Sequence, residues 1–158
     1  MEIVVRYELS SAKKYDGVVK KIIEHAAKNV KYPSGTAVSV SFVGDEKMRA
    51  FNSQYRGKDR TTNVLAFGTT KERKNKRTKE QSSSLVHKSL RSSVDLGDIF
   101  ISLPEAKREA KKCGWTMNYE IARLALHGFL HLLEYDHVQE KEARKMEKIE
   151  AKVLEELT

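Results

Sequence analysis

The stretch His127-Gly-Phe-Leu-His131-Leu-Leu-Glu-Tyr-Asp-His137 holds three of the five histidines of the chain. His127 and His131 are four residues apart, so on a helix their imidazoles project from the same face. His137 follows six residues later, which lets the chain leave the helix and fold back toward the other two. Three neutral imidazoles that converge on one point match a catalytic zinc site, whose fourth position is left to water. The stretch therefore predicts a zincin-like, metal-bearing helix that ends before the third histidine.

The surroundings of these histidines favour a shared metal over three unrelated side chains. Residues 121–133 are largely apolar, and burying an unpaired polar group costs on the order of 1–3 kcal/mol. One ion would satisfy all three imidazoles. We predict a single Zn²⁺ held by His127, His131 and His137, with another divalent transition metal such as Ni²⁺ also compatible, and no covalent cofactor.

The same histidine spacing occurs in the metzincin peptidases, whose pattern is H-E-x-x-H-x-x-G-x-x-H. In those enzymes the glutamate after the first histidine is the general base of peptide hydrolysis. This chain has Gly128 at that position, and glycine can neither take nor give a proton. The ligand pattern is therefore present without the base, which argues against a zinc peptidase.

A different family fits the stretch better. It closely resembles the H-G-x-L-H-L-x-G-Y-D-H signature of the YbeY family, the metal-dependent endoribonucleases of ribosomal RNA maturation. Residues 51–67, FNSQYRGKDRTTNVLAF, are similar to the family's L-N-x-x-Y-R-x-x-D-x-P-T-D-V-L-S-F block, and residues 96–99, LGDI, match its L-G-D-I block. The three blocks stand in the family's order and cover most of the chain from about residue 38 to residue 137.

The resemblance implies a function, a substrate and partners. It implies a zinc-dependent, single-strand-specific endoribonuclease in ribosomal RNA (16S 3′-end) maturation and ribosome quality control. The expected partners are the ribosomal RNA precursor and the small ribosomal subunit. Whether water or the RNA 2′-hydroxyl attacks the phosphate is not decided by the matching residues, and the oligomeric state is left open.

Three positions depart from the family pattern. Glu134 stands where the family has the glycine before Tyr-Asp-His. A helix commonly ends there in a left-handed residue, in which a side chain costs about 1 kcal/mol. Either Glu134 carries this strain or the turn is built differently. Asn63 replaces an aspartate and Thr61 a proline; the asparagine keeps an acceptor for a turn or a cap but loses the charge that acid–base work needs.

Composition sets the broad class. The 158 residues fit one domain, no apolar run approaches the roughly 20 residues of a membrane span, and the N-terminus lacks a secretory pattern. Cys113 is the only cysteine, so neither a disulfide nor a cysteine-based metal site is expected. These features predict a cytoplasmic protein with no membrane partner. The formal net charge of +8 indicates an anionic partner, most commonly nucleic acid.

Hydrophobic patterns predict alternating strands and helices. We expect strands at residues 2–9, 38–42, 64–67 and 95–102, and helices from Ser10 or Ser11 as a cap to about 30, and over 45–55, 104–112, 118–133 and 140–157. The strand at 38–42 alternates valine and phenylalanine with serine, which is typical of a half-buried strand. The predicted fold is α+β: a single domain, residues 1–158, with a small mixed sheet packed against several helices.

A basic, polar insertion is expected at about residues 69–92, where lysine, arginine, glutamate and serine dominate. It is either a solvated linker between two strands or an arm that follows RNA phosphates. The candidate backbone contacts are Lys58, Lys71, Arg73 and Lys74. His87 lies in this segment and is not expected to be a ligand, and His25 is expected on the surface of the first helix.

The other candidate site residues surround the metal. Arg56 matches the family's Tyr-Arg block, which implies an arginine that clamps the phosphate during cleavage; otherwise it is a surface arginine at a helix end. We count Arg56, His127 and His131 as catalytic. The candidates to support the ligand histidines are Asp98, Asp136 and Glu134. For the two aspartates, the alternative is a role in a turn or as a cap.

Two functions of other classes remain open. One is a non-catalytic RNA-binding factor in ribosome assembly with a structural metal, which a fourth protein ligand such as Glu134 would favour because structural zinc sites are closed. The other is a zinc hydrolase of small molecules or peptides.

Overall fold

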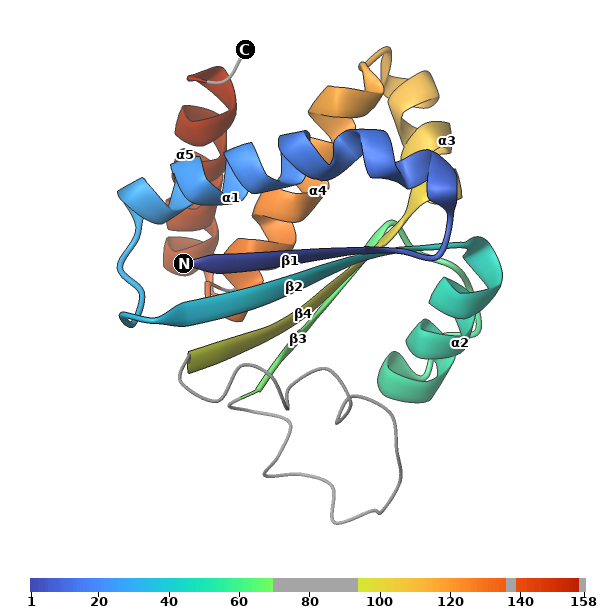
Figure 1. Ribbon diagram of the computed structural model, residues 1–158, viewed down its shortest axis with the longest axis horizontal. Coiled ribbons are helices and arrows are strands. Elements are labelled where there is room, and N and C mark those ends of the chain that lie inside the picture. Colours follow the sequence, from blue (N-terminus) through green and yellow to red (C-terminus); the bar gives the residue numbers. More distant parts are fainter. Residues whose placement is uncertain (70–93, 136–138, 157–158) are drawn as a thin grey trace.

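The computed structural model describes residues 1–69, 94–135 and 139–156. Along the chain these form strand β1 (Glu2–Tyr7), a 3₁₀ helix η1 (Ser10–Tyr15), helix α1 (Asp16–Asn29), strand β2 (Thr36–Val43), helix α2 (Asp45–Arg56), strands β3 (Val64–Gly68) and β4 (Val94–Ser102), and helices α3 (Leu103–Cys113), α4 (Met117–Leu132) and α5 (Glu140–Glu155). Figure 1 shows the arrangement of these elements around one sheet.

The four strands form one mixed sheet in the order β1-β2-β4-β3. β2 is parallel to both β1 and β4, whereas β3 is antiparallel to β4. Helices α1 and α4 cover one face of the sheet, α5 packs beside them, and α2 lies toward the other face (Figure 1). The predicted α+β fold with a small mixed sheet is confirmed.

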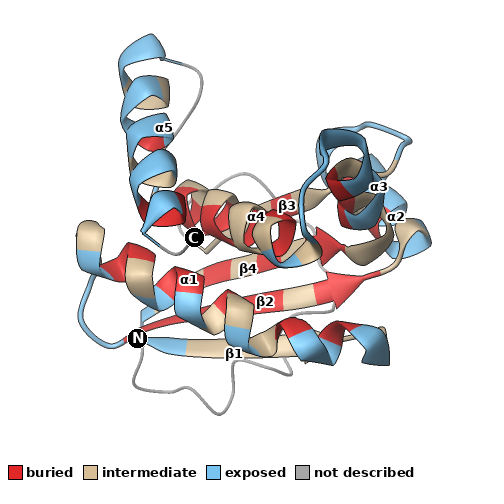
Figure 2. Ribbon diagram, turned by 90° about the horizontal axis from the view of Figure 1, so that it is seen from above, coloured by how far each residue is buried: buried red, intermediate tan, exposed pale blue. Residues whose placement is uncertain are grey.

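The prediction of a half-buried strand at residues 38–42 was wrong. β2 is buried at every position except Ser41, which is intermediate, and Figure 2 shows its buried residues running along most of the strand. β2 is a central strand with a parallel neighbour on each side and cover on both faces, an arrangement in which even small polar residues become inaccessible. Its serines therefore reflect close packing and do not mark a solvent face.

The main core lies between the sheet and α1, α4 and α5. Alternate residues of β2 and β4, including Val40, Phe42 and Ile99, point into it and are fully buried. Helix α1 supplies Ile22 and Ile23. A second, smaller cluster on the other face holds Val43, Met48 and Leu65, with Phe51, Phe67 and Phe100 packed against it.

The predicted cap at Ser10 or Ser11 is also wrong. The segment Ser10–Tyr15 is a separate 3₁₀ helix, and α1 begins at Asp16 without a side-chain cap. The tight turns bury Ala12 and Tyr15, and the Tyr7 hydroxyl donates a hydrogen bond to Asp16. Burial of the Tyr7 hydroxyl, with the neighbouring Asp16 carboxylate, raises its pKa to about 12.

The other predicted helix boundaries differ from the observed ones by one or two residues. The start of α4 is explained by Thr116, whose side-chain hydroxyl accepts a hydrogen bond from the backbone of Tyr119. The predicted insertion lies outside the described residues except for Thr69. Within the described part of the chain, every helix is too short or too polar to traverse a lipid bilayer.

Candidate active site

His127 and His131 lie one turn apart on α4 and direct the same ring nitrogen toward a common point. Their Nε2 atoms are 3.0 Å apart, and the two rings are nearly perpendicular, at 79°. Two nitrogens bound tetrahedrally to zinc at about 2.0–2.1 Å would lie roughly 3.3 Å apart. The donor set and its spacing therefore fit one shared ion.

The third predicted ligand, His137, lies outside the described residues, as does Asp136. Among the residues that the structure describes, no group of three potential ligands is found. The structure thus brings together two of the three histidines, and the third ligand stays a prediction.

Gly128, between the two ligand histidines, is required by packing. A Cβ atom built on Gly128 would stand 2.7 Å from Cγ2 of Ile99, a fully buried residue of β4. Helix α4 therefore lies closer to the sheet than a side chain at this position allows. The glutamate of the peptidase pattern has no space here, so the structure agrees with the argument against a metzincin.

Glu150, which the sequence analysis did not identify as a site residue, contacts the site from α5. Its Oε1 atom lies 2.7 Å from Nδ1 of His127, the ring nitrogen opposite to the one that faces His131. Met146 of this helix is fully buried, and Glu150 is one turn further along the same side. That spacing places the carboxylate at the border of the buried face, but only the packing of α5 on α4 directs it to a histidine.

The end of α4 carries the strain anticipated for Glu134. Its φ is 68°, which makes it the one non-glycine residue with positive φ in the described parts of the chain. The backbone N–H of Glu134 donates to the carbonyl of His131 at 3.0 Å, and that of Tyr135 donates to Leu130 at 3.1 Å. This pair of bonds is the Schellman motif, which usually has glycine in the left-handed position. The helix thus ends in the usual geometry with an exposed glutamate in place of glycine.

A cleft of about 210 Å³ runs between α4 and the loop that follows α2. We call residues 57–63 the cleft loop. The cleft is lined by residues of α2, the cleft loop, β3 and α4: Asn52, Arg56, Lys58, Arg60, Thr62, Asn63, Val64, Leu65, Ala66, His127, Gly128 and His131. The structure thus places Arg56 and Lys58, both predicted from sequence, in one cleft with the two histidines, and adds Arg60.

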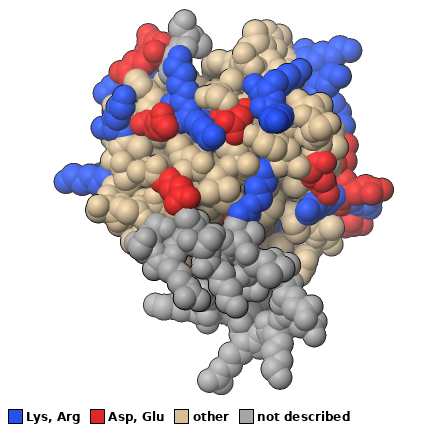
Figure 3. Space-filling model, viewed as in Figure 1, with Lys and Arg blue, Asp and Glu red and all other residues tan. Residues whose placement is uncertain are grey.

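The cleft is the place where uncompensated positive charge collects next to the histidines. Within the described residues, Arg56, Lys58 and Arg60 make no ion pair with an acidic side chain, whereas Arg49 and Arg108 are both paired. On the face drawn in Figure 3, lysine and arginine side chains are interspersed with acidic ones and do not form one continuous patch. The cleft is therefore better suited to an anion than that outer surface.

Asp59 and Arg60 of the cleft loop are anchored to α2. Buried Asn52 donates its side-chain N–H to the carbonyl of Arg60 at 2.8 Å. Arg49 binds Asp59 through two bonds of 2.8 and 2.9 Å, and this guanidinium lowers the pKa of the Asp59 carboxyl. These contacts fix the backbone on both sides of Arg60, so its side chain extends from a defined position.

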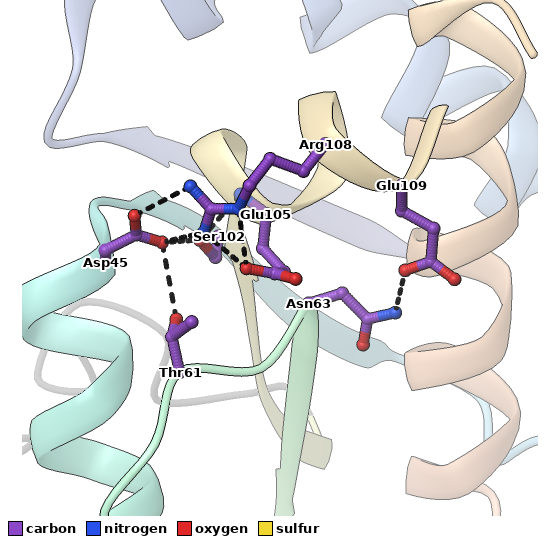
Figure 4. A network of polar contacts seen from close by, with 7 residues as sticks. All are labelled: Asp45, Thr61, Asn63, Ser102, Glu105, Arg108 and Glu109. Carbon is purple, nitrogen blue, oxygen red and sulfur yellow. Dashed lines mark hydrogen bonds and ion pairs between the residues drawn. The ribbon is translucent and has the colours of Figure 1, made fainter. Parts of the chain in front are cut away.

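Thr61 of the cleft loop is anchored through Asp45, as Figure 4 shows. Arg108 of α3 donates to both Asp45 oxygens, at 2.7 and 3.0 Å, and the hydroxyls of Ser102 and Thr61 donate to the same carboxylate at 3.3 and 3.4 Å. The Arg108 bonds are the main cause of a lowered pKa of Asp45. Thr61, which replaces the family's proline, thus secures the loop through its hydroxyl.

Asn63 acts as a donor, contrary to the expectation that its acceptor would matter. Its Nδ2 atom donates to Glu109 Oε2 at 2.7 Å (Figure 4). Arg123 reaches the other oxygen of Glu109 at 3.4 Å and binds fully buried Glu120 at 2.8 and 2.9 Å. The bonds to Glu120 are the main cause of the raised pKa of Arg123. An aspartate at position 63 would place a second carboxylate against Glu109, so the asparagine is explained by its partner.

Asp98 does not reach the histidines. It lies in β4 next to Ile99, whose side chain meets α4, and successive residues of a strand point to opposite faces of the sheet. Its antiparallel partner is Phe67, which belongs to the cluster on the far face. Strand alternation therefore argues against the supporting role of Asp98 at the metal, which stays a prediction, because the sequence block did not indicate which face of the sheet Asp98 occupies.

A sequence profile described as Endoribonuclease YbeY matches residues 5–158. The chain belongs to the YbeY family. The resemblance of its three sequence blocks to those of the family is thereby confirmed.

Curated YbeY relatives match over most of the chain. The Endoribonuclease YbeY of Geobacillus kaustophilus is 41% identical over 128 residues, or 81% of this chain and 77% of the relative. That of Bacillus cereus is 36% identical over 141 residues, or 89% of this chain and 85% of the relative. The solution structure of TM1509 from Thermotoga maritima has a TM-score of 0.61 at 24% identity and covers 98% of this chain and 87% of that one, which shows the same fold.

Three RNA-contact candidates, Lys71, Arg73 and Lys74, lie outside the described residues. They stay predictions, whereas Arg56 and Lys58 have a defined place in the cleft.

Proposed function

We propose that the protein is a zinc-dependent endoribonuclease that cleaves single-stranded RNA in the cleft between α4 and the cleft loop. Membership of the YbeY family supports a hydrolase that acts on RNA. The observation that carries the proposal is the convergence of the His127 and His131 Nε2 atoms in the same cleft as Arg56. A metal site and a phosphate clamp are the two parts that metal-assisted phosphodiester hydrolysis uses.

The histidines and Arg56 would have separate roles in the reaction. His127 and His131, with His137 as the predicted third ligand, would hold the ion, which when bound supplies a water of lowered pKa and polarises a phosphoryl oxygen. Arg56 offers a planar fork of donors that fits two phosphate oxygens and stabilises the charge that grows on them. Gly128 lets α4 pack directly on Ile99 of β4 and contributes no proton-transfer group.

The cleft supports a single-stranded substrate. Its volume of about 210 Å³ is below the roughly 300–1,000 Å³ of ordinary ligand pockets, so it accommodates a phosphate with adjoining sugar rather than a duplex. Lys58 and Arg60 extend the positive charge beyond Arg56 along the same cleft. By the family resemblance, we propose precursor ribosomal RNA on the small subunit as the substrate, with maturation of the 16S 3′ end and ribosome quality control in the cytoplasm as the role.

The decisive experiment combines metal analysis with RNA cleavage. His127→Ala should abolish stoichiometric zinc and cleavage of a single-stranded RNA together. His25→Ala is the matched control, because His25 lies on α1 and pairs with Glu156; it should retain both. Cleavage by metal-free His127→Ala protein would refute the proposal. The product ends identify the nucleophile. Attack by water leaves an acyclic phosphate, at the 5′ end if the 3′-oxygen is the leaving group, whereas attack by the 2′-hydroxyl expels the 5′-oxygen and leaves a 2′,3′-cyclic phosphate.

RNA binding can be tested separately. Replacing Lys58 and Arg60 together with alanine should weaken binding and reduce the salt slope by about 1.4, since each contact to a single-stranded phosphate contributes about 0.7. The control removes the same charge elsewhere, with Lys21→Ala and Lys28→Ala on the exposed side of α1. An equal slope for the two double variants would remove Lys58 and Arg60 from the RNA path.

A further inference from the structure

Glu150 is the feature of this site that the sequence blocks do not include. It belongs to the C-terminal helix α5, 23 residues away from His127 in the chain. We propose that Glu150 is a positioning residue that holds His127 in the tautomer and orientation needed to bind the metal. The inference concerns the site of the proposed function, but it is tested on metal binding and on the ring itself.

The hydrogen bond determines which nitrogen of His127 carries the hydrogen. A neutral imidazole carries one hydrogen, and an ionised carboxylate can only accept. The 2.7 Å contact between Nδ1 and the Glu150 carboxylate therefore places the hydrogen on Nδ1. Nε2 is then left with its lone pair, and this is the atom that lies 3.0 Å from Nε2 of His131. Without a partner on Nδ1, the ring could rotate or place its hydrogen on the ligating nitrogen.

The position of Glu150 is set by core packing. Met146 precedes it by one turn and is fully buried, and Val153 and Leu154 follow it into the same core. Glu150 itself is only 20% exposed, and His127 is 26% exposed. Both partners thus come from helices whose relative placement is fixed by apolar contacts, so the carboxylate reaches Nδ1 without ordering a flexible surface side chain.

A plain ion pair is the alternative role. A contact that served only as an ion pair would not affect how the ring binds a metal. A carboxylate on the distal nitrogen of a ligand histidine is different, because it fixes the tautomer and makes the ring a better donor; its loss typically weakens metal binding 10–100-fold. Metal affinity and the histidine tautomer therefore separate the two roles.

The test measures Zn²⁺ affinity and the ¹⁵N chemical shifts of His127 in metal-free protein for the wild type, Glu150→Ala and Glu150→Gln. We expect Glu150→Ala to weaken Zn²⁺ binding about 10–100-fold and to remove the Nδ1–H signature of His127. Glu150→Gln keeps an acceptor of the same shape, so it should retain that signature and lose less affinity. Glu147→Ala, an exposed glutamate on the same helix, should match the wild type.

The inference is overturned if Glu150→Ala binds Zn²⁺ as tightly as the wild type, or if His127 keeps its Nδ1–H tautomer in that variant. Either result distinguishes this inference from the proposed function. If His127→Ala abolishes cleavage while Glu150→Ala keeps full Zn²⁺ affinity, only the positioning role fails. If Glu150→Ala weakens Zn²⁺ binding while His127→Ala still cleaves RNA, the positioning role stands and the endoribonuclease mechanism fails.

Discussion

The two walls of the cleft are built in different ways. The histidine wall is α4, a helix packed so closely on β4 that Gly128 cannot carry a side chain, with Glu150 behind His127. The opposite wall is the end of α2 and the cleft loop, which is held by polar contacts such as those of Asn52 and Asp45. The groups expected to hold a metal thus stand within a packed helix, whereas those expected to hold RNA extend from the last residue of α2 and from the loop after it. A site on a helix is positioned more accurately than one on a loop. The helix therefore suits a metal, which has a strict coordination geometry, and the loop suits RNA, which is a flexible polymer.

The largest effect is expected from substitution of Arg56, which should change RNA cleavage without changing metal binding. Arg56→Ala should lower the rate of RNA cleavage at saturating substrate by about 100-fold or more, because one preorganised donor to the developing charge is typically worth that much. Zn²⁺ affinity should not change, since Arg56 belongs to the wall without ligands. Cleavage kinetics and metal titration measure the two outcomes.

Two controls sharpen this prediction. Arg56→Lys keeps the charge but loses the two-pronged contact, so it should fall between alanine and the wild type. Arg144→Ala removes an exposed arginine that pairs with Glu140 on α5 and should leave the rate unchanged. If Arg56→Ala cleaves RNA at the wild-type rate, Arg56 is only a surface residue at a helix end.

A smaller effect is expected on the histidine wall itself. Gly128→Ala should destabilise the fold by about 1–3 kcal/mol, the usual cost of overpacking, because the new methyl group meets the buried Ile99 side chain. The free energy of unfolding, obtained by urea denaturation, measures it. Gly17→Ala is the matched control on α1, where a Cβ meets nothing within 4 Å. It should be neutral or stabilising, and equal behaviour of the two variants would disprove the close approach of α4 to β4.

A substitution in the turn that ends α4 should increase the stability of the fold, in contrast to Gly128→Ala. Glu134→Gly should stabilise the protein by about 1 kcal/mol, because glycine adopts the left-handed conformation without the Cβ penalty. Thermal and urea denaturation would detect it. Glu147→Gly in the middle of α5 should instead destabilise by about 1 kcal/mol, the cost of glycine in a helix interior. A loss of stability in both variants would contradict the strained turn.

The smallest effect concerns the loop wall and depends on pH. The pKa of Asp45 in the folded protein lies below its usual 3.8, so its contacts add stability that is present above that pH and is lost as the pH falls through the folded-state pKa. Asp45→Asn should therefore be less stable than the wild type at neutral pH, and the gap should close in strong acid. Urea denaturation over a pH series measures this.

The control for Asp45 comes from the same helical turn. Glu46→Gln removes an exposed carboxylate that makes no ion pair among the described residues, so its effect should be smaller at neutral pH. A constant gap between Asp45→Asn and the wild type from neutral to acid pH would show that the loop is not held by the ionised carboxylate.

Local pattern was enough to predict much of this protein. The four-residue spacing of His127 and His131 sets them on one helix face wherever that helix lies, because helical periodicity is a property of the backbone. The left-handed residue at Glu134 could be anticipated for the same reason, since the end of a helix has few backbone solutions. The order of strands and helices, and the α+β class, likewise follow from hydrophobic periodicity along short segments.

The tertiary structure alone decided which distant residues meet. Glu150 reaches His127 across 23 residues of chain, and Asn63 reaches Glu109 across 46; no local periodicity encodes either contact. The burial of β2 and the far-face position of Asp98 depend on the order of strands and on the helices that cover each face. Side-chain spacing is set by neighbours in the chain, whereas contact partners are set by how whole elements pack.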